Sequence, residues 1–246
     1  MYRYQILIEY EGTKFIGWQT QKKGNSVQKT IEIILSRLLK TRVKLIGAGR
    51  TDAGVHALEQ SAHFETTKII NNKKKLLNSL NYFLKKKLIS IISIIKKKND
   101  FHARYSAKFR IYKYIIFNRE SNPSIFMNRG WHIKNKIDIQ TMKKGAKLLE
   151  GKKDFSTFRA STCSAKSPIK TMSYVKVKKS KNLIVIKFKS KSFLQQQVRS
   201  MVGCLKVLGE KKWNIKKFKA VLVSKKRKLC APPAPPYGLF LEKVIY

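Results

Sequence analysis

The chain is organised around the stretch Gly47-Ala48-Gly49-Arg50-Thr51-Asp52-Ala53-Gly54-Val55-His56-Ala57, which holds three glycines and three alanines in eleven residues. So little side-chain bulk lets the backbone turn tightly and approach a ligand closely. Asp and Glu total 13 against 55 Lys and Arg, so a carboxylate at Asp52, two positions after Arg50, stands out. From the residues alone, the loop is either a surface turn whose aspartate caps a helix or a site where a carboxylate acts on a bound molecule.

Composition limits the class of protein. A chain of 246 residues with 43% hydrophobic residues is long enough for one large or two small folded domains. The net charge of +42 attracts polyanions, and RNA or DNA is the first candidate. The abundance of Lys, Ile and Asn is also what an AT-rich genome produces, so both causes are expected to contribute.

Cysteine usage and hydropathy predict a soluble, cytoplasmic protein. Cys163, Cys204 and Cys230 are too few and too widely spaced for a disulfide framework or a CxxC metal pair. The first residues lack an apolar signal core, and no apolar run approaches the roughly 18 residues of a membrane span. The four histidines are scattered, so no metal site is expected.

Hydrophobic periodicity predicts the order strand, helix, strand, strand, helix, strand in the first hundred residues. The expected strands are 4–10, 43–46, 58–65 and 88–95; the expected helices are 27–38, after Ser26 as N-cap, and 73–84. This order defines a split βαβ (ferredoxin-like) unit, with an antiparallel sheet and both helices on one face.

The same order returns in the second part of the chain. Expected strands there are 109–117, 172–178, 182–190 and 239–245, with helices at 138–150, 192–208 and 215–223. We therefore expect an α+β fold of two domains, 1–100 and 101–246. Their antiparallel sheets are expected to join into one platform, and the second domain is expected to complete a cleft. An open basic face of such a platform suits RNA laid across the strands.

Several motifs resemble one known family. The run Gly49–His56 resembles the active-site motif of the TruA family of tRNA pseudouridine synthases, and Gly17-Trp18-Gln19 resembles its N-terminal signature. From the residues alone, this aromatic segment is either a structural plug or an RNA contact. The strand Lys108–Tyr114 and the helix Phe193–Gly203 resemble further family motifs, although Gln195–Gln197 stand where relatives commonly carry His and Met.

The resemblance implies roles for four residues. Asp52 would be the catalytic aspartate, and Arg199 would pair with it, since a hydrogen-bonded guanidinium keeps a carboxylate ionised and oriented. Tyr112 would lie against the target base. Arg50 would fill the space left when the uridine flips out, or contact its phosphate. His56 and His102 are interpreted as hydrogen-bonding scaffold.

The implied reaction is the isomerisation of uridine to pseudouridine, which breaks the N1–C1′ bond and rejoins uracil through C5. It needs no redox change, and neither cofactor nor metal is expected. The family implies tRNA as substrate, at roughly positions 38 to 40 of the anticodon stem-loop, where bases can be unstacked, and a homodimer. Two alternatives stay open: a non-catalytic RNA-binding module of similar topology, and a synthase that acts on another RNA.

Overall fold

A computed structural model describes residues 1–246, in two compact units. Unit 1 contains Met1–Lys108 together with Leu241–Tyr246, and unit 2 contains Phe109–Phe240. Both units combine helices with mainly antiparallel sheets, as the α+β class predicts.

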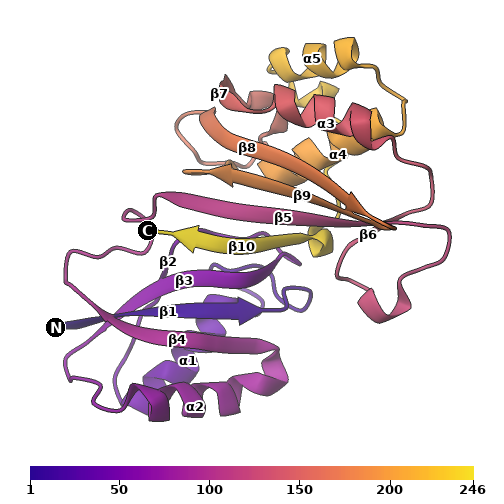
Figure 1. The fold of residues 1–246 in the computed structure, drawn as a ribbon. Helices are drawn as coiled ribbons and strands as arrows, with labels where there is room; N and C mark the ends of the chain where they lie inside the picture. Colours follow the sequence, from indigo (N-terminus) through magenta and orange to yellow (C-terminus); the bar gives the residue numbers. More distant parts are fainter. The chain divides into compact units, whose positions relative to one another are not determined.

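Unit 1 has the predicted element order (Figure 1). Its elements are β1 (Tyr2–Tyr10), α1 (Val27–Leu39), β2 (Ile46–Gly47), β3 (His56–Thr66), α2 (Lys73–Leu84) and β4 (Ile89–Lys97). The strand order is β4-β1-β3, with β2 paired to β3 and every pair antiparallel. This is the strand order of a split βαβ unit.

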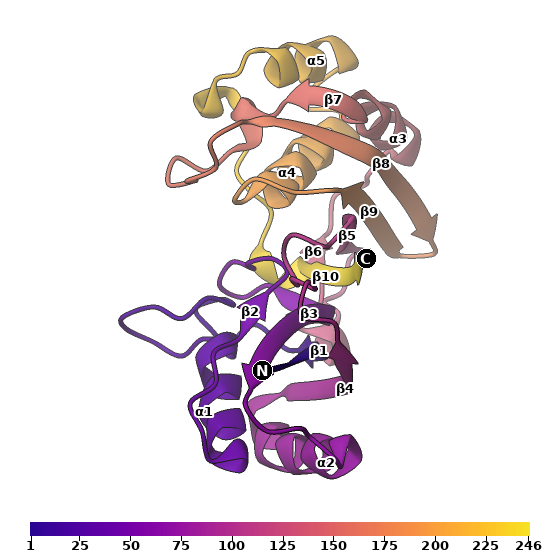
Figure 2. The same cartoon turned by 90° about the vertical axis from the view of Figure 1, so that its left-hand side faces the viewer.

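The core of unit 1 follows the predicted alternation. Tyr4, Ile6, Ile8 and Tyr10 of β1 are buried. Both helices lie side by side along one face of the sheet, as Figure 1 and Figure 2 show. Ser26 caps α1 as predicted, because its side chain accepts a hydrogen bond from the backbone N–H of Lys29.

The second strand is shorter than predicted. A strand was expected over 43–46, but only Ile46–Gly47 pair with β3. Side chains of α1 hold the preceding backbone instead: Ser36 Oγ accepts from Val43 N at 2.9 Å, and Glu32 Oε1 accepts from Leu45 N at 2.8 Å. These N–H groups are thereby satisfied without a neighbouring strand.

The strands of unit 2 are ordered β5-β9-β8-β7, with each neighbouring pair antiparallel and with β6 parallel to β5. Its elements are β5 (Phe109–Asn118), β6 (Trp131–Ile133), α3 (Ile139–Leu148), β7 (Gly151–Asp154), β8 (Ile169–Ser180), β9 (Leu183–Ser190), α4 (Gln197–Gly209) and α5 (Ile215–Val223). The sequence did not predict the short strands β6 and β7. Helices α3, α4 and α5 pack against one another, and α3 also packs on β8.

Helix α4 begins later than the predicted residue 192. Gln196 adopts a left-handed conformation with φ of 59°, which a continuous helix does not allow. Gln197 then starts the helix, and its side chain accepts a hydrogen bond from Leu194 N at 2.8 Å. The glutamines at which the chain departs from the family motif therefore form the turn that opens α4.

Strand β10 (Leu239–Ile245) begins in unit 2 and continues in unit 1. Residues 101–108 also belong to unit 1, because Ala103 N donates to His63 Nδ1 at 3.1 Å and Lys108 N donates to Ile245 O at 2.7 Å. The compact units thus divide after Lys108 and again after Phe240. Independent domains at 1–100 and 101–246 stay a prediction.

Candidate active site

Asp52 lies in unit 1 on the connection between β2 and β3. Its side chain is half-buried, whereas Thr51 before it is buried and Arg50 is exposed. Val55 N donates to Asp52 O at 3.2 Å, so a turn closes directly after the aspartate. The carboxylate is therefore presented from a tight loop and does not cap a long helix.

Hydrogen bonds from neighbouring strands hold this loop. Ala48 N donates to Ser61 O at 2.7 Å, and Gln60 Nε2 donates to Gly49 O at 2.9 Å. The hydroxyl of Tyr10 and Thr51 Oγ1 share a buried hydrogen bond of 2.8 Å. Because β1 and β3 supply these contacts, the position of Asp52 is set by the sheet, as a preorganised catalytic group requires.

The aromatic segment after β1 packs directly on the Asp52 loop. Trp18 N donates to Thr51 O at 3.1 Å, and the Trp18 ring is only 2% exposed. A Cβ at Gly47 would lie 2.5 Å from Trp18 Nε1, and a Cβ at Gly17, where φ is +114°, would lie 2.6 Å from Thr51 O. Both glycines are therefore required for the close approach. Of the two interpretations of this segment, the burial of Trp18 favours a structural plug.

Arg50 is oriented by a neighbouring amide. Gln19 Oε1 accepts a hydrogen bond from Arg50 Nε at 3.1 Å, which ties the exposed guanidinium group to the aromatic segment. Arg50 and Asp52 therefore lie on one loop, with a cation at the surface and a carboxylate set deeper.

The histidines near the motifs accept backbone hydrogen bonds, which confirms their predicted scaffold role. His56 is buried, and its Nδ1 accepts from Gly12 N at 3.0 Å. His102 Nδ1 accepts from Arg104 N at 3.2 Å and from Tyr105 N at 3.3 Å.

Tyr112 and Tyr114 point to the buried side of β5 in unit 2. The Tyr112 ring is 9% exposed and meets the Phe193 ring edge-on, with the centroids 5.0 Å apart. Tyr114 is fully buried, and its hydroxyl donates to Pro235 O at 2.8 Å. Burial raises the pKa of the Tyr114 phenol well above its usual range, so this hydroxyl stays protonated.

Arg199 lies in the first turn of α4 and is fixed by the segment Ala231–Pro236. Arg199 Nε donates to Ala234 O at 2.8 Å, and Ala234 N donates to Arg199 O at 3.0 Å. A Cβ at Gly203 would lie 2.1 Å from Pro232 O, so helix and segment are in direct contact. The Ala/Pro-rich segment thus orients the arginine.

The predicted site residues fall in two groups. Arg50 and Asp52 share a loop of unit 1, and Tyr112 and Arg199 belong to β5 and α4 of unit 2. The pairing of Asp52 with Arg199 and the approach of Tyr112 to the base stay predictions. The sequence placed Gln19 in a family signature but did not predict its contact with Arg50. It also missed the contact of Arg199 with Ala234, because a backbone carbonyl carries no recognisable motif.

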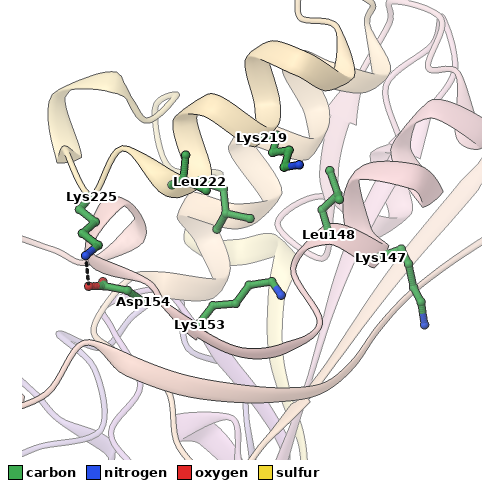
Figure 3. A pocket seen from close by; sticks show the side chains of 8 residues that line it. Lys147, Leu148, Lys153, Asp154, Lys219, Leu222 and Lys225 are labelled. Carbon is green, nitrogen blue, oxygen red and sulfur yellow. Dashed lines mark ion pairs between the residues drawn. The ribbon is translucent and has the colours of Figure 1, made fainter.

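A pocket of about 500 Å³ lies among α3, β7 and α5 (Figure 3). Its lining comprises Lys147, Leu148, Lys153, Asp154, Lys219, Leu222, Val223 and Lys225. Lys153 extends into the hollow beneath Lys219, while Lys225 Nζ pairs with Asp154 Oδ2 at 3.8 Å. Four lysines against one carboxylate make the pocket basic, which favours anions. It contains none of the predicted site residues.

No group of three or more His, Cys, Asp or Glu side chains in the chain is arranged to hold a metal ion. None of the helices combines the length and the apolar character needed to cross a membrane.

Comparison with known proteins identifies the class of protein to which the chain belongs. A family model described as tRNA pseudouridine synthase matches residues 6–106 and 146–246, and the chain therefore belongs to this family of isomerases. This finding favours an enzyme over the alternative of a non-catalytic RNA-binding module.

Full-length relatives then narrow the class to the TruA group. The chain is 65% identical to tRNA pseudouridine synthase A of Pelagibacter ubique (strain HTCC1062) over 246 residues, all of both chains. It is 42% identical to the protein of that name from Rhodopseudomonas palustris (strain BisA53), again over all of both chains. For Ehrlichia canis (strain Jake), the identity is 43% over 99% of this chain and 100% of the relative.

Proposed function

We propose that this enzyme isomerises uridines in the anticodon stem-loop of tRNA, at roughly positions 38 to 40, where bases can leave the stack. Asp52 acts as the catalytic nucleophile, Arg199 pairs with it, Tyr112 lies against the target uracil, and Arg50 occupies the vacated stack or contacts the phosphate. We further propose that the enzyme works as a homodimer in the cytoplasm.

The observation that carries the proposal is the support of the Asp52 loop. Its backbone is held by β1, β3 and the aromatic segment, through bonds to Thr51, Gly49 and Ala48. The chain has only 13 acidic residues against 55 basic ones, so a carboxylate in this loop is unusual for its composition. A carboxylate close to RNA phosphates is also repelled by their negative charge. A loop braced this firmly supports a chemical task for that carboxylate.

The chemistry conserves atoms and electrons. The N1–C1′ bond breaks, the uracil turns, and a C5–C1′ bond forms while C5 loses a proton and N1 gains one. A carboxylate can assist by attacking the uracil ring, or by stabilising charge at C1′ while the sugar passes through a glycal-like form. An arginine beside Asp52 keeps it ionised in either route.

The test is pseudouridine mapping on a tRNA that carries uridines at these positions, with wild type and Asp52→Asn compared. We expect conversion by wild type and no conversion by the variant, with tRNA binding retained because the asparagine is isosteric. Conversion at other tRNA positions only would contradict the proposed substrate region. Conversion by Asp52→Asn at the wild-type rate would remove Asp52 from the chemistry.

The dimer has its own test, which is sedimentation of the purified chain with and without tRNA. A monomer under both conditions at assay concentration contradicts the homodimer and leaves the roles of the four residues standing.

A further inference from the structure

Two cysteines that pseudouridine synthesis does not use meet inside unit 2. The Sγ atoms of Cys204, on α4, and Cys230, after the 3₁₀ turn Arg227–Leu229, are 3.5 Å apart. Both are free thiols; Cys204 is fully buried and Cys230 is partly exposed. The third cysteine, Cys163, is a buried free thiol.

Rigid elements hold the two sulfur atoms close together. Two contacts hold α4 against the segment Ala231–Pro236. Gly203, directly before Cys204, faces the carbonyl of Pro232 at close range, and Arg199 and Ala234 form a reciprocal pair of hydrogen bonds. Cys230 N donates to Arg227 O at 3.0 Å, which anchors the backbone of the other cysteine. The thiols therefore face each other across a close-packed seam, and a bond between them requires only a small approach from 3.5 Å to about 2.05 Å.

We propose that Cys204 and Cys230 form a reversible disulfide when the protein meets a low-molecular-weight disulfide of the glutathione class, with Cys230 as the attacking thiol and Cys204 as the resolving thiol. The bond ties α4 covalently to the segment Ala231–Pro236. Nothing in the proposed catalytic roles is needed for this inference.

The chemistry around the pair divides the two roles. A hydrogen bond from the Cys204 thiol lowers the pKa of Cys230, with support from the Arg227 guanidinium, so Cys230 is the thiol that ionises first. The same hydrogen bond and burial raise the pKa of Cys204. Cys230 is also the more exposed residue of the pair, and the run Lys225–Lys228 beside it contains only Lys and Arg, which attract the negatively charged glutathione disulfide.

The exchange balances in two steps. The Cys230 thiolate attacks one sulfur of oxidised glutathione, which forms a mixed disulfide and releases one glutathione thiolate. That step removes both the hydrogen bond with the Cys230 thiolate, which is the largest cause of the raised pKa of Cys204, and the negative charge of Cys230. Cys204 then gives its proton to water or to the released thiolate, attacks Cys230 Sγ and releases the second glutathione. The protein loses two electrons and two protons, and oxidised glutathione is reduced to two thiols.

The test exposes the full-length protein to oxidised glutathione, blocks the remaining thiols by alkylation and digests the product with trypsin. The three cysteines fall in different tryptic peptides, Ala160–Lys166, Ser200–Lys206 and Leu229–Lys243. We expect a crosslink between the last two peptides, with a loss of about 2 Da for the two hydrogens, that dithiothreitol reverses. Cys163→Ser is the matched control and should form the same crosslink at the wild-type rate.

Two variants test the assigned roles. Cys204→Ser should stop at glutathione bound to Cys230, and Cys230→Ser should leave Cys204 unmodified because it is buried. Glutathione on Cys204 in Cys230→Ser would reverse the assignment and overturn it.

A measurement on wild type does not depend on how the variants fold. In mixtures of reduced and oxidised glutathione, the equilibrium constant for the crosslink should be at least about tenfold larger for the native protein than in urea, because the native fold brings the thiols together. An equal or smaller constant in the native protein, or no crosslink at all, would refute the proposal.

Discussion

Gly17→Ala should slow pseudouridine formation strongly although residue 17 carries no chemical group. An alanine Cβ at this position would lie 2.6 Å from Thr51 O, whereas ordinary contacts begin at 3.4 Å, so the Asp52 loop has to retreat by 3.4 − 2.6 = 0.8 Å. A misplacement of about 1 Å at a catalytic group costs on the order of 100-fold in rate, or about 2.7 kcal/mol. The φ of +114° adds about 1–3 kcal/mol of backbone strain to the folded state.

Gly24→Ala is the matched control on the same connection between β1 and α1. Gly24 also has a left-handed φ, of +85°, but its Cβ would meet the Ile16 side chain at 2.7 Å, and that side chain can rotate away. Both variants therefore carry similar strain, and only Gly17→Ala pushes on Thr51. Single-turnover pseudouridine formation on tRNA, with thermal unfolding of each variant, separates the two effects. A Gly17→Ala rate within about twofold of the Gly24→Ala rate would show that the loop position does not set activity.

Three further predictions concern charge. Arg199→Lys should lose most activity with its thermal unfolding little changed, because an ammonium lacks the planar fork that pairs with a carboxylate; near-normal turnover would exclude the proposed pairing. Burial, with smaller contributions from neighbouring charges, lowers the pKa of His63 from 6.5 to about 4. Between pH 6.5 and about 4, His63 is therefore protonated in the unfolded chain but neutral in the folded protein. The free energy of unfolding is unaffected by His63 above pH 6.5 and decreases by up to about 3 kcal/mol as the pH falls to about 4. Urea unfolding across this range should show a shallower pH dependence for His63→Gln, and equal slopes would contradict the assignment. We predict that the basic pocket binds RNA phosphates, with one phosphate at each of Lys153 and Lys219. Lys153→Ala combined with Lys219→Ala should then weaken tRNA binding and reduce the slope of log affinity against log salt by about 2. Lys152→Ala with Lys216→Ala is the control, and identical slopes for the two pairs would contradict phosphate binding in the pocket.

Local patterns predicted most of the fold because the residues that decide each element are close in sequence. The alternation in β1 and the capping serine of α1 both describe short-range geometry, and both are observed. The failures are tertiary. Glu32 and Ser36 take backbone donors that would otherwise extend β2, and only the packed position of α1 makes that contact possible.

In the candidate site too, short-range features could be predicted from the sequence and tertiary contacts could not. The motif around Asp52 predicted a tight, glycine-bounded loop with Arg50 beside the aspartate, which the structure has. The bond from Arg199 to the carbonyl of Ala234 joins positions 35 residues apart through a backbone atom that every residue type possesses. No sequence pattern marks such an acceptor, so the orientation of the arginine could be known only from the structure.

The return of Leu241–Tyr246 to unit 1 has a consequence for protein synthesis. The Tyr246 hydroxyl donates to Ala103 O at 2.9 Å and shares a hydrogen bond of 2.7 Å with the Ser61 hydroxyl, and Lys243 Nζ lies 3.8 Å from Glu59 Oε1. A ribosome therefore makes the Asp52 loop early, but the strand that completes its unit emerges only after the whole of unit 2. Until then the nascent unit 1 has an open sheet edge at β3, whose unpaired backbone groups make this interval the one most exposed to aggregation.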